Sequence, residues 1–148
     1  MSTIKQLNYE TINSVMTTEL NSLANNARAI SSAEGADGTA ADLFGDWELS
    51  VTFGTAPTAG TGCDLYLVRS ADGTNYEDGD ASNAPSANAY VGTFGPLRAV
   101  TTAQRLIIPD VPMPPGLYKA VLLNNGTGQS FPASGSTLKV RTHNRQVV

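Results

Sequence analysis

The residues best suited to chemistry lie in one acidic stretch, "SADGTNYEDGDASN", which runs from Ser70 to Asn83. It places Asp72, Glu77, Asp78 and Asp80 among turn-forming residues, and clustered carboxylates are the ligands that calcium prefers. An EF-hand loop fails in the registers that start at Asp72 or Asp78, because neither has Gly at the sixth position and Glu at the twelfth. A looser calcium site built from Glu77, Asp78 and Asp80 stays open.

The first half of this stretch also predicts a structural role. Ser70, Asp72, Gly73 and Tyr76 resemble the Asp-box pattern of β-hairpins, in which the Asp side chain accepts backbone N–H bonds and the Gly permits a positive φ. We therefore expect a turn closed by Asp72, followed by an exposed excursion over 77–88. Such a loop is better suited to contact with a partner than to catalysis.

Catalytic patterns are missing from the sequence. His143 is the only histidine, so every scheme with a histidine general base depends on it, and no G-x-S-x-G motif or phosphate-binding glycine loop occurs. Glu48 and Asp64 could join the acidic stretch in a carboxylate pair, but neither lies in the apolar setting that raises the pKa of a general acid. We therefore predict that the protein is not an enzyme and has no catalytic residue, no cofactor and no defined metal ligand.

The C-terminal stretch "TLKVRTHNR" predicts a strand with a basic face. Period-two alternation points its apolar side chains inward and Lys139, Arg141 and His143 outward, with Arg145 continuing the row. We therefore expect His143 to be exposed. The row formed by Lys139, Arg141 and Arg145 has two interpretations: a solvated sheet face, or a positive strip that docks against an acidic neighbouring subunit.

Composition limits the protein class. A chain of 148 residues with 15% charged residues fits one folded domain, and its net charge of −4 argues against a general nucleic-acid binder. Cys63 is the only cysteine, so no intramolecular disulfide can form, and we expect it to be a small buried hydrophobe. No apolar run approaches the ~20 residues that span a bilayer, and the start has no signal-peptide pattern. These features predict a protein made in the cytoplasm, with no membrane or nucleic-acid partner.

The first thirty residues differ from the rest of the chain. Met16, Leu20 and Leu23 recur with Ala27 and Ile30 at steps of three and four, which predicts a short helix over 17–28 preceded by an arm. The helix could pack on the protein's own body. Alternatively, the segment 1–30 is an arm that reaches a neighbouring subunit, with Met16, Leu20 and Leu23 as contact residues.

From Leu43 onward the hydrophobic period changes to two. In "DWELSVTF" the side chains of Trp47, Leu49, Val51 and Phe53 fall on one face, and five further short runs alternate or are apolar between clusters of turn residues. This pattern predicts an all-β domain over 31–148, an antiparallel β-sandwich or jelly-roll-like barrel. The prolines of "PDVPMPPG" predict that 109–116 lies outside the sheets, as a stiff connection.

The second half of the chain resembles small virion proteins of tailed bacteriophages, of the head decoration or cement type and related minor structural proteins. The best matching phrases are "PMPPGLYK" and "ASGSTLK", within a likeness that covers about 20–144. The resemblance implies a β-sandwich or jelly-roll protein present in many copies, located in the virion. It would stabilise the particle by binding the major capsid protein or other virion subunits, and it would form a homo-oligomer.

A second function class stays open beside this one. The sandwich could be a host-recognition module that binds a glycan through the loop 70–88, with calcium in the site. Aromatic residues make up only 7% of the chain, which is few for a groove that binds sugars by stacking.

Overall fold

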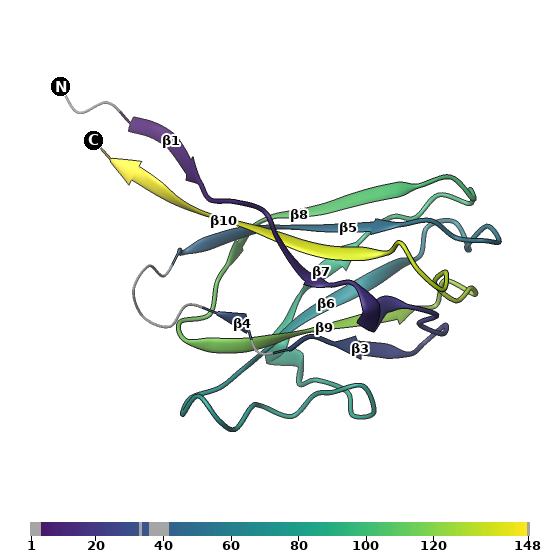
Figure 1. Ribbon diagram of the computed structural model, residues 1–148, viewed down its shortest axis with the longest axis horizontal. Coiled ribbons are helices and arrows are strands. Elements are labelled where there is room, and N and C mark those ends of the chain that lie inside the picture. Colours follow the sequence, from purple (N-terminus) through teal and green to yellow (C-terminus); the bar gives the residue numbers. More distant parts are fainter. Residues whose placement is uncertain (1–3, 33, 36–41, 148) are drawn as a thin grey trace.

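The computed structural model describes residues 4–32, 34–35 and 42–147, which form a sandwich of two antiparallel β-sheets (Figure 1). Sheet A contains β1 (Ile4–Tyr9), β2 (Asn13–Met16), β5 (Phe44–Val51), β8 (Gln104–Pro112) and β10 (Thr137–Val147). Sheet B contains β3 (Arg28–Ile30), β4 (Glu34–Gly35), β6 (Gly62–Arg69), β7 (Tyr90–Phe94) and β9 (Leu117–Asn125). The predicted all-β sandwich is therefore confirmed.

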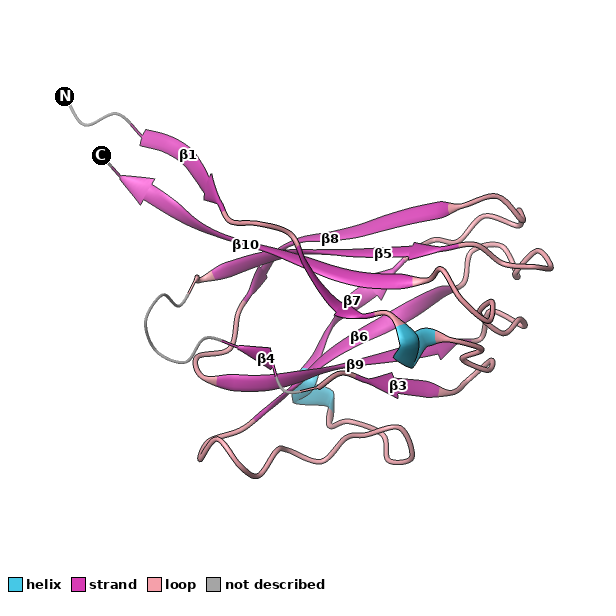
Figure 2. Ribbon diagram, in the orientation of Figure 1, coloured by secondary structure: helices cyan, strands magenta, loops and turns pink. Residues whose placement is uncertain are grey.

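The predicted N-terminal helix is wrong. The only helices in the described residues are the 3-10 turns η1 (Thr18–Leu20) and η2 (Ala87–Ala89), drawn in cyan in Figure 2. Neither has the length to cross a membrane. Residues 13–30 instead form β2, η1 and β3, and the chain reverses at Ser22 and Asn26, whose φ angles of 55° and 62° end any helix.

The predicted boundary at residue 30 does not separate two units. β1 and β2 both pair with β10 in sheet A, and β3 pairs with β9 in sheet B. The first thirty residues therefore supply strands to the same two sheets as the rest of the chain.

The core lies between the sheets and follows the predicted alternation. Along β5 the side chains of Trp47, Leu49 and Val51 are buried, while those between them are half-buried on the outer face. Phe131 packs edge-on against Phe53, with 5.6 Å between ring centroids. A smaller cluster of Val68, Ala89 and Val121 covers the outer face of sheet B.

The prediction that 109–116 lies outside the sheets is wrong in its first half. Pro109 and Pro112 lie within β8, and β8 pairs with β5 at the edge of sheet A. Proline is tolerated there because an edge strand has one side without ladder hydrogen bonds, so the missing N–H leaves no partner unsatisfied.

Candidate functional site

The strongest group of chemically competent side chains lies on three adjacent strands of sheet A. The strand order places β10 beside β5 and β5 beside β8. In this register His143 lies opposite Phe44, and Asp46 lies two residues further along β5 on the same outer face. The pairing of β10 with β5 therefore brings His143 close to Asp46, although the two residues are 97 positions apart in the sequence.

A β-bulge adds the third residue. Gly45 pairs with Val111 and Trp47 with Ile108, so two residues of β8, Pro109 and Asp110, oppose Asp46 alone. Asp110 has a φ of 54°, a left-handed conformation that Asp adopts more readily than most residues. Its backbone N–H donates to Asp46 Oδ1 at 2.9 Å, which fixes the bulge against β5. Bulges often re-aim a side chain at functional sites, and this one brings the Asp110 carboxylate to His143.

His143 is fully buried, so the predicted exposure is wrong. The alternation predicted its face correctly, because His143 lies on the outer side of the sheet opposite Phe44. Its ring stacks on the Phe44 ring, with 5.8 Å between centroids and 16° between planes, and two carboxylates lie against Nε2. β1 also flanks this position, since Tyr9 pairs with His143 through the backbone.

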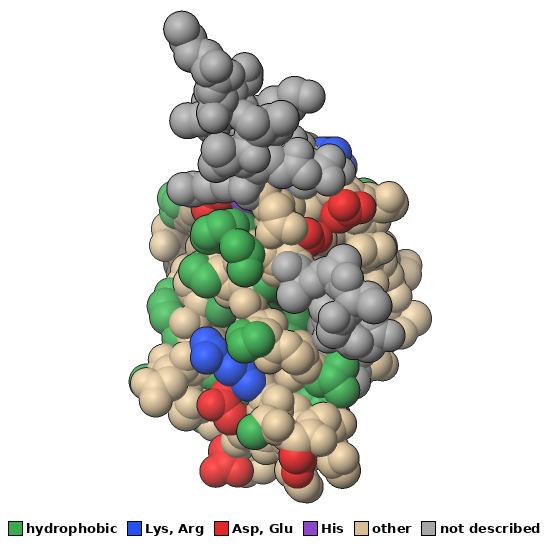
Figure 3. Space-filling model, turned by 90° about the vertical axis from the view of Figure 1, so that its left-hand side faces the viewer, with side chains coloured by type: hydrophobic (Ala, Val, Ile, Leu, Met, Phe, Trp, Pro, Cys, Tyr) green, Lys and Arg blue, Asp and Glu red, His purple; other side chains and the backbone are tan. Residues whose placement is uncertain are grey.

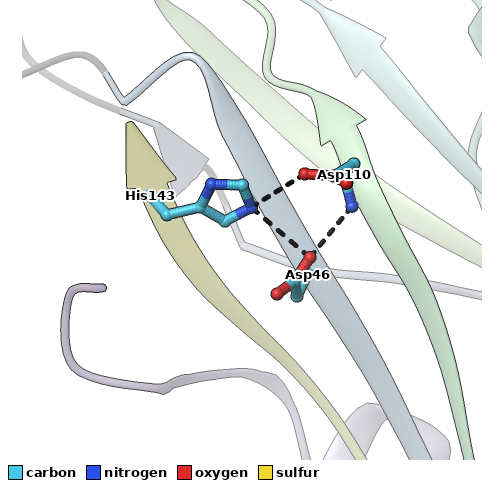
Figure 4. A group of neighbouring side chains, drawn as sticks. All are labelled: Asp46, Asp110 and His143. Atoms are coloured by element: carbon cyan, nitrogen blue, oxygen red, sulfur yellow. Dashed lines mark hydrogen bonds and ion pairs between the residues drawn. The ribbon is translucent and has the colours of Figure 1, made fainter. Parts of the chain in front are cut away.

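The three side chains converge on a small volume. His143 Nε2 lies 3.4 Å from Asp46 Oδ1 and 3.4 Å from Asp110 Oδ1, and Figure 4 shows both carboxylates facing the same ring nitrogen. One ligand atom from each residue lies within 4.8 Å of the others. The Asp46 and Asp110 side chains are 28% and 54% exposed, so solvent reaches the carboxylate side of the group.

The surroundings of this group are mixed in character. Figure 3 views the molecule from this end and shows acidic side chains at the surface close to hydrophobic ones. Leu43, which precedes β5, is 62% exposed, and its N–H donates to Asn144 Oδ1 at 2.8 Å. Asn144 Nδ2 in turn donates to Asp42 Oδ1, so the start of β5 is tied to β10 just beyond the imidazole.

The acidic stretch that dominates the sequence forms turns instead. Asp72 Oδ1 accepts the backbone N–H groups of Thr74 and Asn75 at 2.8 and 2.7 Å, and it also accepts the Ser70 hydroxyl. The Asn75 and Thr74 N–H donors hold the pKa of the Asp72 carboxyl well below its usual range. The predicted Asp-closed turn is confirmed.

Asp80 repeats this arrangement eight residues later. Asp80 Oδ1 accepts the N–H groups of Asn83 and Ser82 at 2.7 and 2.6 Å, and Asn83 Nδ2 donates to Oδ2 at 3.0 Å. These bonds, from Asn83 first, lower the pKa of Asp80. Among the described residues, Glu77, Asp78 and Asp80 do not form a group of three ligands close enough to hold a metal ion. The stretch does line an open hollow of about 650 Å³ with Lys119.

The predicted contact residues of the N-terminal arm lie in the core. Met16, Leu20 and Leu23 are 1%, 0% and 7% exposed and pack in the main cluster between the sheets. Their steps of three and four arise from a strand end and a 3-10 turn that both face inward. Of the two interpretations, packing on the protein's own body is the one that the structure supports.

The basic row is interleaved with acidic residues. Lys139 lies opposite Glu48 and Arg141 opposite Asp46, and Glu48 also forms an ion pair with Arg105 at 3.5 Å. Arg141 Nε donates to the Glu10 carbonyl at 3.0 Å, so it holds the chain between β1 and β2. The backbone of Arg145 belongs to β10, and its side chain lies outside the described residues. Docking of this row on a neighbouring subunit stays a prediction.

The remaining candidates have structural surroundings. Glu48 lies in sheet A and Asp64 in sheet B, where Asp64 Oδ2 accepts Asn125 Nδ2 at 2.7 Å, so the two carboxylates do not form a pair. Cys63 is buried as predicted, and burial raises the pKa of its thiol to about 12.

Sequence reasoning missed the group formed by Asp46, Asp110 and His143. Its members come from three separate phrases, and none of the three has a local motif. The one available signal was "IPDVP", where an Asp between two prolines in a strand-like run favours a bulge.

Comparisons with known proteins identify no family. No protein-family model matches the chain, and no curated protein matches it. Among solved structures the chain is similar to the CBM36-1 domain of a multidomain xylanase from the hindgut metagenome of Trinervitermes trinervoides, with 13% identity and a TM-score of 0.49. The alignment covers 96% of this chain and 99% of that chain. A likeness at this level carries no information on ligand or partner.

Proposed function

We propose that the protein is a non-enzymatic structural protein of a tailed-bacteriophage virion, a decoration or cement protein that binds neighbouring virion subunits. The observation that carries this proposal is the ribbon made by β1 and the end of β10. Beyond the other strands these two strands continue together away from the sandwich (Figure 1). The phrases that resemble virion proteins supply the class of partner.

The ribbon has the properties of a binding element. β10 pairs with β5 only as far as His143, and in the described residues its continuation pairs with β1 alone, through Asn144, Gln146 and Val147. A two-stranded ribbon is marginally stable in water on its own. Its outer edges present backbone N–H and C=O groups that a partner strand can pair with, as in strand addition.

Strand addition would require no cofactor and no catalytic group. Main-chain hydrogen bonds supply the affinity, and the side chains on the ribbon supply the choice of partner. The rigid sandwich then holds the ribbon at a fixed angle to the surface that it joins. Many copies of such a protein, each clamping neighbouring subunits, stabilise a particle by mass action.

The experiment is co-sedimentation of the purified protein with particles assembled from the major capsid proteins of candidate tailed bacteriophages. The wild type is compared with Gln146→Pro, which removes a backbone N–H from the ribbon outside the sandwich. We expect a similar midpoint of thermal unfolding and at least a tenfold weaker association with particles. Ala81→Pro, in the exposed excursion, is the matched control and should bind like the wild type.

Two results would overturn the proposal. A Gln146→Pro variant that decorates particles as well as the wild type removes the ribbon from the interface. A wild type that never enters particles, stays monomeric in light scattering and binds a sugar refutes assembly altogether.

A second candidate function, glycan binding, is favoured by the open hollow beneath the acidic excursion. Its lining offers hydroxyl, amide and charged groups from Tyr76, Asp78, Asn83 and Lys119, which suit sugar hydroxyls. However, Lys119 Nζ lies 4.4 Å above the Tyr76 ring, on a face that a sugar would need for stacking. A glycan-array screen with and without calcium tests this function, and a specific hit that Asn83→Ala abolishes would establish it over the first.

A further inference from the structure

We propose that Asp46, Asp110 and His143 bind a divalent transition-metal ion of the zinc class. The ion would fasten β5, β8 and β10 at the place where the ribbon leaves the sandwich. This inference does not depend on the proposed function, because it concerns the sandwich itself and not the partner.

The distances fit metal ligands better than a hydrogen-bonded triad. A charge-assisted N–H···O bond from imidazole to carboxylate measures about 2.7–2.9 Å. Both Nε2 to Oδ1 distances here are 3.4 Å. Two ligand atoms that each lie about 2.0–2.1 Å from a tetrahedral zinc ion are ~3.3 Å apart, which is close to the two Nε2–Oδ1 distances.

The ring is held in place before any ion arrives. Stacking on Phe44 fixes the plane of the fully buried imidazole, and its Nε2 faces the two partly exposed carboxylates. Across from the imidazole, the bulge sets the backbone position of Asp110, and the Asp110 N–H donates to Asp46 Oδ1 and holds that carboxylate. The imidazole and the Asp46 carboxylate therefore lose little rotamer entropy on binding, which favours affinity.

The donor set selects the class of ion. One imidazole nitrogen and two carboxylate oxygens suit zinc and its first-row neighbours, whereas calcium takes six to eight oxygen ligands and magnesium keeps most of its water. A divalent ion would also neutralise the two carboxylates that face each other beside the ring. The exposed side of Asp110 leaves room for water or for a donor from another molecule to complete the coordination.

The test is isothermal titration of the untagged full chain, first stripped with a chelator, with zinc chloride and in parallel with cobalt and calcium chloride. We expect one zinc ion per chain, a cobalt complex with visible absorption bands of a four- or five-coordinate ion, and at least tenfold weaker binding of calcium. Zinc should also raise the midpoint of thermal unfolding by several degrees, because it binds the folded state.

Variants locate the ion. Asp110→Asn keeps a residue that tolerates positive φ but removes one charged ligand, and we expect at least thirtyfold weaker zinc binding with the fold retained. His143→Asn should abolish binding and the cobalt bands. Asp78→Asn makes the same charge change at an exposed residue of the excursion and should bind zinc like the wild type.

Three outcomes would overturn the proposal. These are no heat and no stabilisation with zinc, tighter binding of calcium than of zinc, and zinc binding that Asp110→Asn leaves unchanged. In the last case the ion occupies another site on the chain.

Discussion

The two outer faces of the sandwich each carry a group of carboxylates, and the two groups are built in opposite ways. In the loop that joins β6 to β7 of sheet B, Asp72 and Asp80 accept hydrogen bonds from residues two and three positions further along the chain. On sheet A, Asp46 and Asp110 face an imidazole that a third strand supplies. A carboxylate that accepts hydrogen bonds from its own turn serves to stabilise that turn. Carboxylates brought together from different strands can instead face a common ligand.

The two groups of carboxylates should also differ in how much stability is lost when one residue is replaced. The turns at Asp72 and Asp80 are exposed and close only a few residues each. The group at His143 joins three strands and includes a buried ring, so its members depend on the packing of the whole sheet. Removing a residue should therefore unfold a loop in the first case and destabilise the domain in the second.

The largest effect is expected for His143→Ala. The change removes a fully buried ring that packs on Phe44 and leaves two carboxylates facing a cavity, which should lower the free energy of unfolding by about 3 kcal/mol. Urea denaturation followed by tryptophan fluorescence measures this directly. Tyr76→Ala, on the other face, removes a half-buried ring and should cost about 1 kcal/mol. Equal losses of unfolding free energy in the two variants would contradict the view that the His143 group supports the whole domain and the loop does not.

A smaller effect is expected for Gly73→Ala in the Asp72 turn. Gly73 has a φ of 77°, and an L-residue in this conformation costs about 1 kcal/mol even though the nearest atom to the new Cβ would be Leu117 Cδ1 at 3.7 Å. The same denaturation experiment applies. Gly54→Ala is the matched control, because Gly54 has no positive φ and nothing within 4 Å, so its stability should stay the same or rise slightly. If Gly54→Ala lowered the free energy of unfolding as much as Gly73→Ala, the positive φ of Gly73 would not be the cause of the loss.

The smallest effect is a local response to acid. Because their turns lower the pKa values of Asp72 and Asp80, these carboxyls stabilise the folded loop fully above pH ~4, and that stabilisation is lost as the pH falls below this value. Amide exchange of Thr74 and Asn75, corrected for intrinsic rates, should show constant protection from pH 7 to 5 and loss of protection toward pH 2. Protection that is unchanged at pH 2 would show that the Asp72 charge does not hold the turn.

Much of the fold could be predicted because its signals are local. Alternation in "DWELSVTF" specifies both the strand and its buried face, and an Asp followed by Gly in "SADGTNY" specifies its own turn. The prediction of an N-terminal helix was wrong because the spacing of apolar residues does not distinguish a helix from a strand end followed by a 3-10 turn. In the structure, Ser22 and Asn26 both have a positive φ, which interrupts any helix over this segment.

The group on sheet A could not be predicted from the sequence. Its geometry depends on the register of β10 on β5 and on one bulge in β8, both of which are set by long-range pairing. The alternation gave the correct face for His143 and the wrong exposure, because it says nothing of what covers a face. Here the groups that cover His143 include Phe44 and two carboxylates from neighbouring strands.

The prolines of β8 make the two edges of sheet A different in their ability to pair with an added strand. One edge of the sheet ends in β8, where Pro109 and Pro112 cannot donate to an added strand, and the other side continues into the ribbon of β1 and β10. Under the proposed function, the ribbon is therefore the side of the sheet that pairs with a partner, and β8 is the side that resists an added strand. A chain that pairs with its partners through the ribbon alone would end on the surface that it joins, and β8 would not let further copies add edge to edge into fibres.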